Sequence, residues 1–400
     1  MDRKNRKRVT YVSSANATLR SYGIREEKKK KKRRPLPVQL RSALLIIAAA
    51  ALIAVVMSVA VDNSGRTAVG KATRIGATLS QNVVPFGDNV IFYDGTTLHC
   101  VAAGGGNQWS YQIGTNADYD ATEKRIVAWS GNDIYILNTN GRLTYNNKMS
   151  DQIQFASAGD NYVAVFVGEP DNGVITVIDG NGQVVDNVAI SNQTLLDIGF
   201  FYSSTSSSSQ QTELMWVLGL DTTGTVISTE LQTFQPGKLS TGKSSLGEHI
   251  AYMIYGHNEM LNIVDTRQIM HYNYRGLEQE ESTLIYGYAM SDVKTVGNTL
   301  YQLLIPEQEQ NQGMVIGNVR LMYNGVDRVI HLPGVCMDAR LGTHSVYGFA
   351  SNTVYACRYG ETTFSSYSLP VNITSVLGMI SDNRVVAASG SEIYVIELPT

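Results

Sequence analysis

The sequence has little cysteine and lacks the H-E-x-x-H and G-x-S-x-G motifs of two common kinds of enzyme site. Three cysteines, Cys100, Cys336 and Cys357, occur in 400 residues, and this odd number in no zinc-binding spacing does not indicate a disulfide framework. Cys336 and Cys357 could pair if their strands are neighbours, although buried free thiols are the expected state. No H-E-x-x-H or G-x-S-x-G motif is present. The sequence therefore assigns no catalytic residue, no metal ligand and no cofactor.

Two segments have some features of ligand loops but are better explained as turns. The segment from Asp179 to Asp186 lacks the sixth-position glycine and terminal glutamate of an EF-hand calcium loop. The glycines 104–106 precede Trp109 and a further strand rather than the helix that a phosphate site requires. The histidines form no close ligand pair: they are His99, His249, His257, His271, His331 and His344.

Charge is distributed very unevenly along the chain. Residues 1–41 hold fifteen Lys and Arg against three acidic residues, a net charge of +12, and residues 42–400 carry a net charge of −15. Residues 42–61 hold no charge, no proline and no glycine, and twenty helical residues span the roughly 30 Å hydrocarbon core. A buried helix of a soluble protein would keep one polar face, which this segment lacks. The pattern therefore predicts a transmembrane helix.

The flanks predict the orientation of this helix. A basic cluster precedes the span, at Lys28, Lys29, Lys30, Lys31, Lys32, Arg33, Arg34 and Arg41. Positive charge before a span marks the cytoplasmic side and attracts anionic lipid. A signal peptide cleaved after Ala60 is the alternative, but the apolar core is longer than the usual 7–15 residues. We expect an uncleaved anchor in the cell membrane, a disordered cytoplasmic tail and an extracytoplasmic remainder.

The basic tail could also be a nuclear-localisation or nucleic-acid-binding segment, because such segments have the same composition as a basic cluster that sets membrane topology. No aromatic-rich RNA-binding pattern accompanies this one, so we expect the lipid bilayer, and no nucleic acid, as its partner.

Beyond residue 73 the helical period is absent and short apolar strands repeat. Eight similar units begin near residues 88, 124, 160, 212, 248, 297, 343 and 382, at intervals of 36 to 52 residues. Propeller blades run close to 40–45 residues, and eight tandem units suit a β-sandwich poorly. Asn140-Gly141 and Asn181-Gly182 are typical of two-residue hairpins, and consecutive apolar positions such as 134–137 are typical of strands buried on both faces.

These patterns predict an all-β propeller of seven or eight blades, with eight favoured. The domains expected are a basic tail at 1–41, the transmembrane helix at 42–61, a linker at 62–73 and the propeller at 74–400. The last unit stops short of an outer strand, so segment 72–78 is expected to complete that blade and close the ring. The Ser-rich segment 203–209 and the polar segment 307–312 are expected to be exposed insertions.

One blade carries a recognisable signature. The segment from Gly106 to Gly114, GNQWSYQIG, resembles the blade ending of quinoprotein-type (PQQ-like) propeller repeats. The whole layout resembles a family of single-span bacterial membrane proteins whose outer domains are PQQ-like or WD40-like propellers. This resemblance implies an extracytoplasmic propeller in a cell membrane and no reaction. Quinoprotein dehydrogenases carry a vicinal disulfide that this chain lacks, and the chain is more similar to non-catalytic scaffold relatives.

Two functions are compatible with this layout. The favoured one is a binding or scaffold module for an envelope protein, peptide or glycan; the alternative is an extracytoplasmic hydrolase or lyase with carboxylates gathered at the propeller funnel. Seven tyrosines between residues 250 and 301 offer a recognition surface, although strand packing explains tyrosines equally well. They are Tyr252, Tyr255, Tyr272, Tyr274, Tyr286, Tyr288 and Tyr301.

Overall fold

The computed structural model describes residues 67–68, 70–205, 208–238, 240–279, 281–307, 315–381 and 383–399, which belong to one unit, Arg66–Thr400. The predicted tail and span, with the basic cluster from Lys28 to Arg41, lie outside the described residues. Within the described ranges, no helix has the length and apolar character of a membrane span.

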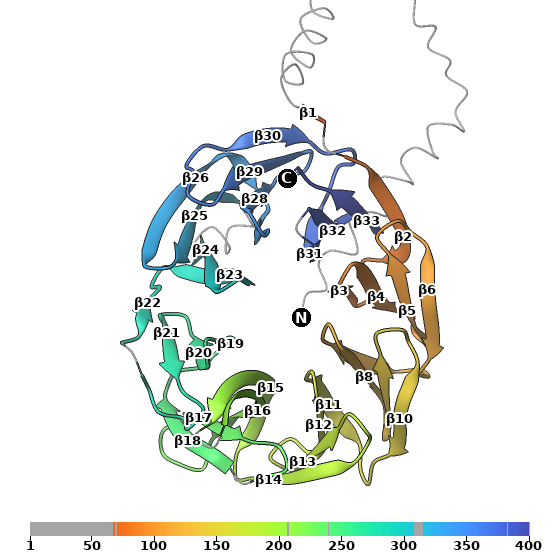
Figure 1. Ribbon diagram of the computed structural model, residues 1–400, viewed down its shortest axis with the longest axis vertical. Helices are drawn as coiled ribbons and strands as arrows, with labels where there is room; N and C mark the ends of the chain where they lie inside the picture. The colour runs from red at the N-terminus through yellow and green to blue at the C-terminus, as the bar shows by residue number, and fades with distance from the viewer. Residues whose placement is uncertain are drawn as a thin grey trace, which may run out of the picture. The chain divides into compact units, whose positions relative to one another are not determined.

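The described strands form eight antiparallel sheets arranged as the blades of a ring (Figure 1). In each blade the first strand lies nearest the axis of the ring and the last lies at the periphery. The eight blades predicted from the sequence repeats are therefore confirmed.

The blades follow chain order. Blade 1 holds β3 (Val83–Phe86), β4 (Asn89–Tyr93), β5 (Thr97–Ala102) and β6 (Asn107–Gln112); blade 2 holds β7 (Ala117–Ala121), β8 (Arg125–Ser130), β9 (Asp133–Asn138) and β10 (Leu143–Lys148). Blade 3 holds β11 (Ile153–Ala158), β12 (Tyr162–Glu169), β13 (Asn172–Asp179) and β14 (Val184–Ser191); blade 4 holds β15 (Thr194–Thr205), β16 (Ser208–Asp221), β17 (Ser228–Phe234) and β18 (Ser240–Gly247). Blade 5 holds β19 (Met253–His257), β20 (Met260–Val264), β21 (Gln268–Tyr272) and β22 (Thr283–Leu284); blade 6 holds β23 (Tyr288–Val296), β24 (Thr299–Pro306), β25 (Ile316–Tyr323) and β26 (Val326–Cys336). Blade 7 holds β27 (Asp338–Leu341), β28 (Ser345–Phe349), β29 (Thr353–Arg358) and β30 (Ser365–Ser368), to which β1 (Thr67–Ala68) adds a parallel fifth strand.

Blade 8 closes the ring with strands from both ends of the propeller. It holds β31 (Ser375–Ser381), β32 (Arg384–Ser389) and β33 (Glu392–Glu397), and its outer strand is β2 (Ala72–Thr78). The pairing joins Ala72 to Ile396, and Ile75, which is 2% exposed, enters the core between blades 8 and 1. The predicted closure is confirmed, because β2 pairs with the outer edge of β33 and so joins the two ends of the propeller in one blade.

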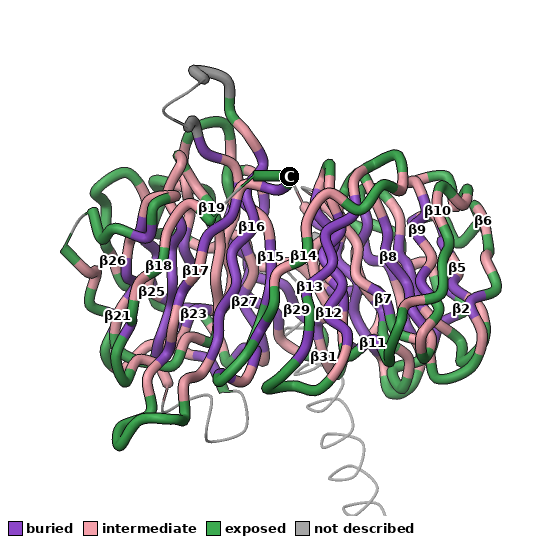
Figure 2. The backbone as a smooth tube through the Cα atoms, turned by 90° about the horizontal axis from the view of Figure 1, so that it is seen from below, coloured by how far each residue is buried: buried purple, intermediate pink, exposed green. Residues whose placement is uncertain are grey.

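The hydrophobic core consists of eight clusters, each between two adjacent blades. In blades 2 and 3, for example, Val127 and Ile136 pack against Val163 and Val165. All five residues of β28 are buried, because a strand between two blades loses contact with water on both faces. Figure 2 shows the buried segments along the middle of the strands and the exposed segments at their ends.

The turns follow a different geometry from the one expected at Asn140-Gly141. Asn138 N donates to Arg142 O at 3.0 Å and Gly141 N donates to Asn138 O at 2.9 Å, so the hairpin is a longer loop with Gly141 alone at positive φ, +72°. The Asn138 side chain determines this shape, because its Oδ1 accepts the N–H groups of Asn140 and Arg142.

The turn at Asn181-Gly182 is built in the same way. Asp179 Oδ1 accepts the N–H groups of Asn181 and Gln183, and Gly182 has φ +81°. Two-residue turns with both φ values positive occur instead at Asn258-Glu259 and Asn324-Gly325.

Aromatic side chains from one blade dock on these turns of the next blade. The Trp109 indole covers Gly141, where an added Cβ would lie 2.3 Å from the ring, and its Nε1–H donates to Thr139 O at 3.0 Å. Tyr145 covers Gly182 in the same manner. The segment that resembles a PQQ-like blade ending therefore joins blade 1 to blade 2.

Two local expectations were wrong. The fifth unit is displaced by one strand, because the apolar run after His249 forms the innermost strand β19 rather than a second strand. The described residues of the Ser-rich segment are strand rather than loop: they extend the β15–β16 hairpin, in which Ser203 pairs with Thr212 and Ser204 with Gln211. The polar segment after Glu307 connects β24 to β25, and its residues 308–314 lie outside the described ranges.

Candidate interaction face

The ring has two faces that differ in the connections they carry. We name the hairpin face after the turns between first and second and between third and fourth strands. The crossover face carries the loops between second and third strands and the connections from one blade to the next. On this face several crossing segments are bonded to the loop of the preceding blade, as Ile153 N to Gly131 O at 2.9 Å and Ile285 N to Arg267 O at 2.8 Å.

Large apolar side chains are exposed on the crossover face of blades 4 to 6. They come from loop 222–227, connection 248–252, the end of β22 and connection 285–287. We name them the apolar patch: Val226 (57% exposed), Ile227 (53%), Ile250 (62%), Tyr252 (46%), Leu284 (67%) and Tyr286 (80%). Exposed apolar side chains that gather in one region of a surface indicate an interaction site.

Backbone hydrogen bonds hold the segments under this patch. Tyr252 N donates to Val264 O at 2.9 Å, and Glu307 N donates to Gly287 O at 3.0 Å. The Tyr252 hydroxyl accepts the N–H of Met290 at 2.8 Å, while Ile285, next to Tyr286, is fully buried. Tyr252, Leu284 and Tyr286 therefore stand on a fixed framework, which lowers the entropy lost when a partner binds.

The surroundings of the patch are more acidic than basic. Glu248 and Glu307 have no ion-pair partner among the described residues, and neither has the exposed Arg267, whose carbonyl accepts Ile285 N. Asp265, 3% exposed, is bonded to His249. Burial raises the pKa of the Tyr252 hydroxyl, and the negative charges of Asp265 and Glu307 raise it further. A partner with positive charge beside its apolar contacts would complement this surface.

The sequence identified part of this face. Of the seven tyrosines proposed as a recognition surface, Tyr252 and Tyr286 belong to the patch, and the other five join the cores between blades, as the packing alternative predicts. Sequence reasoning missed Val226, Ile227, Ile250 and Leu284, since exposed apolar residues in a strand-rich sequence look the same as core residues.

The innermost strands carry aspartates that the alternative, enzymatic function would need. Asp118, Asp120, Asp197, Asp292 and Asp338 each accept the N–H of the following residue through Oδ1. Two also reach the next blade: Asp120 Oδ2 accepts Ala158 N at 2.9 Å, and Asp292 Oδ2 accepts Leu341 N at 2.8 Å.

These bonds satisfy backbone donors on strands that have no inner neighbour. Burial raises the pKa of Asp292 and of Asp338, and the Arg340 guanidinium partly offsets the rise. Within the described ranges, no three His, Cys, Asp or Glu side chains lie close enough to share a metal ion. Asp120 and Asp292 are thus built into joints between blades, and the other three bond within their own strands.

A further buried carboxylate joins blades 3 and 4 on the hairpin face. Glu213, 4% exposed, accepts Asp160 N at 2.5 Å and Asn161 N at 2.7 Å. Burial raises the pKa of this carboxyl above its ordinary value, and the two N–H donors counteract part of the rise.

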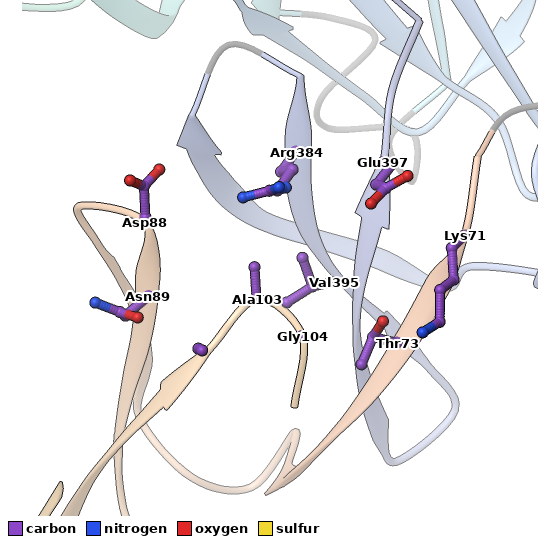
Figure 3. Close-up of a pocket in the computed structure, with 10 residues that line it drawn as sticks. Lys71, Thr73, Asp88, Asn89, Ala103, Gly104, Arg384, Val395 and Glu397 are labelled. Atoms are coloured by element: carbon purple, nitrogen blue, oxygen red, sulfur yellow. The ribbon is translucent and has the colours of Figure 1, made fainter. Parts of the chain in front are cut away.

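A pocket of about 310 Å³ lies on the hairpin face where the ring closes between blades 8 and 1. Lys71, Asp88, Arg384 and Glu397 border it, and we name it the closure pocket. In Figure 3 the Arg384 side chain extends toward the side of the pocket where Asp88 and Asn89 lie, and Glu397 lies between Arg384 and Lys71.

The cysteines of the sequence are buried, and His99 and His271 are hydrogen-bonded to neighbouring side chains. All three cysteines are buried and free, so Cys336 and Cys357 do not pair. His99 is bonded to Asp94 at 2.7 Å and His271 to Asn262 at 2.7 Å.

The comparisons with known proteins support the fold. No protein-family model and no curated protein matches the sequence. Sqt1 of Saccharomyces cerevisiae matches with a TM-score of 0.53 at 10% identity, covering 84% of this chain and 100% of its own. A eukaryotic initiation factor matches with a TM-score of 0.50 at 10% identity, covering 81% and 87%, and BamB from Moraxella catarrhalis with 0.46 at 10% identity, covering 82% and 99%. The chain is an eight-bladed β-propeller, and at this identity the similarities show the fold alone.

Proposed function

We propose that this chain is a membrane-anchored scaffold whose propeller holds an extracytoplasmic envelope protein through the apolar patch. The observation that carries the proposal is the gathering of six exposed apolar side chains on the crossover face of blades 4 to 6. Tyrosine and large aliphatic side chains on a fixed framework are the usual anchors of protein interfaces.

The partner we propose is a protein segment with apolar side chains flanked by Lys or Arg. Apolar anchors would cover Ile250 and Tyr286, and basic flanks would face Glu248 and Glu307. The net charge of −15 on residues 42–400 would also raise the association rate of a basic partner. An aliphatic-rich patch favours a protein over the glycan that the sequence left open.

The anchor is supported by the sequence alone. The uncharged segment 42–61 has the length of a span, and the basic cluster from Lys28 to Arg41 sets the amino terminus in the cytoplasm. A protease added outside intact cells should remove a tag placed after Thr400 and leave a tag before Met1 protected. The opposite pattern of protection would contradict this topology.

The patch is tested by proximity labelling in native cells from a tag after Thr400. The test variant is Ile250→Ser with Tyr286→Ser, and the matched control is Leu277→Ser, which alters a 55% exposed side chain on the hairpin face. We expect a reproducible set of partners to be lost in the test variant, since two interface anchors together contribute about 2–4 kcal/mol. The control should retain the set. Equal labelling by wild type, test variant and control would contradict the proposal.

The alternative function, a hydrolase or lyase, would require carboxylates free to reach a substrate. The five aspartates of the innermost strands that accept adjacent backbone N–H groups are better explained by strand and blade joining, so the binding function is favoured.

A further inference from the structure

We infer that the closure pocket binds a small zwitterion, such as an amino acid or a short peptide with free ends. The pocket combines two cations and two anions around one cavity of about 310 Å³. This volume is at the lower end of the usual range of ligand sites, roughly 300–1,000 Å³.

The four charged side chains face the cavity without pairing. Lys71 and Arg384 form no ion pair with Asp88, Glu397 or any other described residue. Two pairs elsewhere in the ring are closed instead, Lys124 with Asp160 at 2.6 Å and Arg340 with Asp338 at 2.9 Å. The cavity therefore separates charges that a ligand can bridge.

The floor of the pocket leaves room for the body of such a ligand. It is formed by small or apolar residues, including Ala103, Gly104 and Val395, of which Ala103 and Val395 are buried. Thr73 and Asn89 add neutral polar groups at the sides. A short aliphatic body above this floor would present its carboxylate to Arg384 and Lys71 and its ammonium group to Asp88 and Glu397.

The position of the pocket predicts an effect on ring closure. Lys71 lies just before β2, Glu397 ends β33, and Asp88 belongs to blade 1. A bound zwitterion would connect the two ends of the ring to the first blade, and a ligand that binds only the folded ring raises its unfolding temperature.

The test uses the purified full-length chain in detergent and four probes that share one dipeptide body. L-alanyl-L-alanine is a zwitterion, its N-acetyl derivative is an anion, its amide is a cation, and the N-acetyl amide is neutral. We expect a saturable rise in unfolding temperature and a calorimetric binding signal with the zwitterion only. A saturable response with none of the probes, or an equal response with all four, would overturn the inference.

Two variants locate the site. Arg384→Gln and Asp88→Asn should each weaken binding tenfold or more, and their unfolding temperatures without ligand show whether they fold. The control is Arg358→Gln, which alters a cation beside the comparable pocket between blades 7 and 8. Retention of full affinity by both test variants, or loss only in the control, would place binding elsewhere and reject the closure pocket.

Discussion

Replacing Gly141 with alanine tests the joint between blades 1 and 2. Gly141 has φ +72°, a conformation that costs an L-residue roughly 1–2 kcal/mol. The new Cβ would also lie 2.3 Å from the Trp109 ring, so the indole must move. Its hydrogen bond to Thr139 O, 3.0 Å long, contributes about 0.5–1.5 kcal/mol and would be lost. We expect the free energy of unfolding to fall by about 2–4 kcal/mol in total, with the lost packing of the indole included.

Gly131→Ala is the matched control. Gly131 also has a positive φ, +59°, but a Cβ added there would have no other atom within 4 Å, so only the backbone cost of roughly 1–2 kcal/mol applies. For a ring of this size, 1 kcal/mol corresponds to about 1.5 °C of unfolding temperature, from the per-residue entropy of unfolding. Calorimetry should show a fall of about 3–6 °C for Gly141→Ala and about 1.5–3 °C for Gly131→Ala.

The double variant Trp109→Ala with Gly141→Ala isolates the contact. Removing the indole also removes the clash, so the double variant should lose less stability than the two single variants added together. Equal losses for Gly131→Ala and Gly141→Ala, or strict additivity with Trp109→Ala, would refute the docking of the indole on the turn.

Three further changes test other joints. Asp120→Asn should lower the free energy of unfolding by about 1–2 kcal/mol, because one of the two backbone N–H groups bonded to Asp120 loses its acceptor. Asp118 has only its local bond, so Asp118→Asn should lower it by less when both variants are unfolded in urea. Ile75→Ala, in the closing strand, should cost about 2–5 kcal/mol, and an unchanged urea midpoint would argue against the closure described. Glu213 has a pKa raised above its unfolded value of 4.5, so its contribution to stability is fully present below that value and is lost as pH rises through the folded pKa. The unfolding temperature of wild type minus that of Glu213→Gln should therefore be larger at pH 5 than at pH 7, and a constant difference would contradict the raised pKa.

The repeat pattern allowed the ring to be predicted from the sequence. Strands held between two blades are apolar at consecutive positions, as in 134–137, and eight such units recur at blade-sized intervals. The missing outer strand of the last unit indicated that segment 72–78 closes the ring. The predicted start of the fifth unit was displaced by one strand, because the innermost strand of blade 5, Met253–His257, is nearly as apolar as a second strand.

The candidate sites were largely hidden from sequence reasoning. Ile250 and Leu284 are exposed, but an isolated aliphatic residue in a strand-rich chain predicts burial. The closure pocket joins residues 71, 88, 384 and 397, which become neighbours only when the ends of the propeller meet. Asp120 and Asp292 could not be distinguished from ordinary turn aspartates, since their partners Ala158 and Leu341 lie in the next blade.

The closing strand has a consequence for biosynthesis. β2 is made before any other strand of the ring except β1, and its partner β33 is made last. At roughly 5–20 residues per second, the ribosome needs about 15–60 s between them. During that time the chain leaves a strand without a partner, and blade 8 has to form after synthesis is nearly finished. A chaperone that binds extended segments would find its target at residues 72–78, and chains terminated before β33 should be captured there.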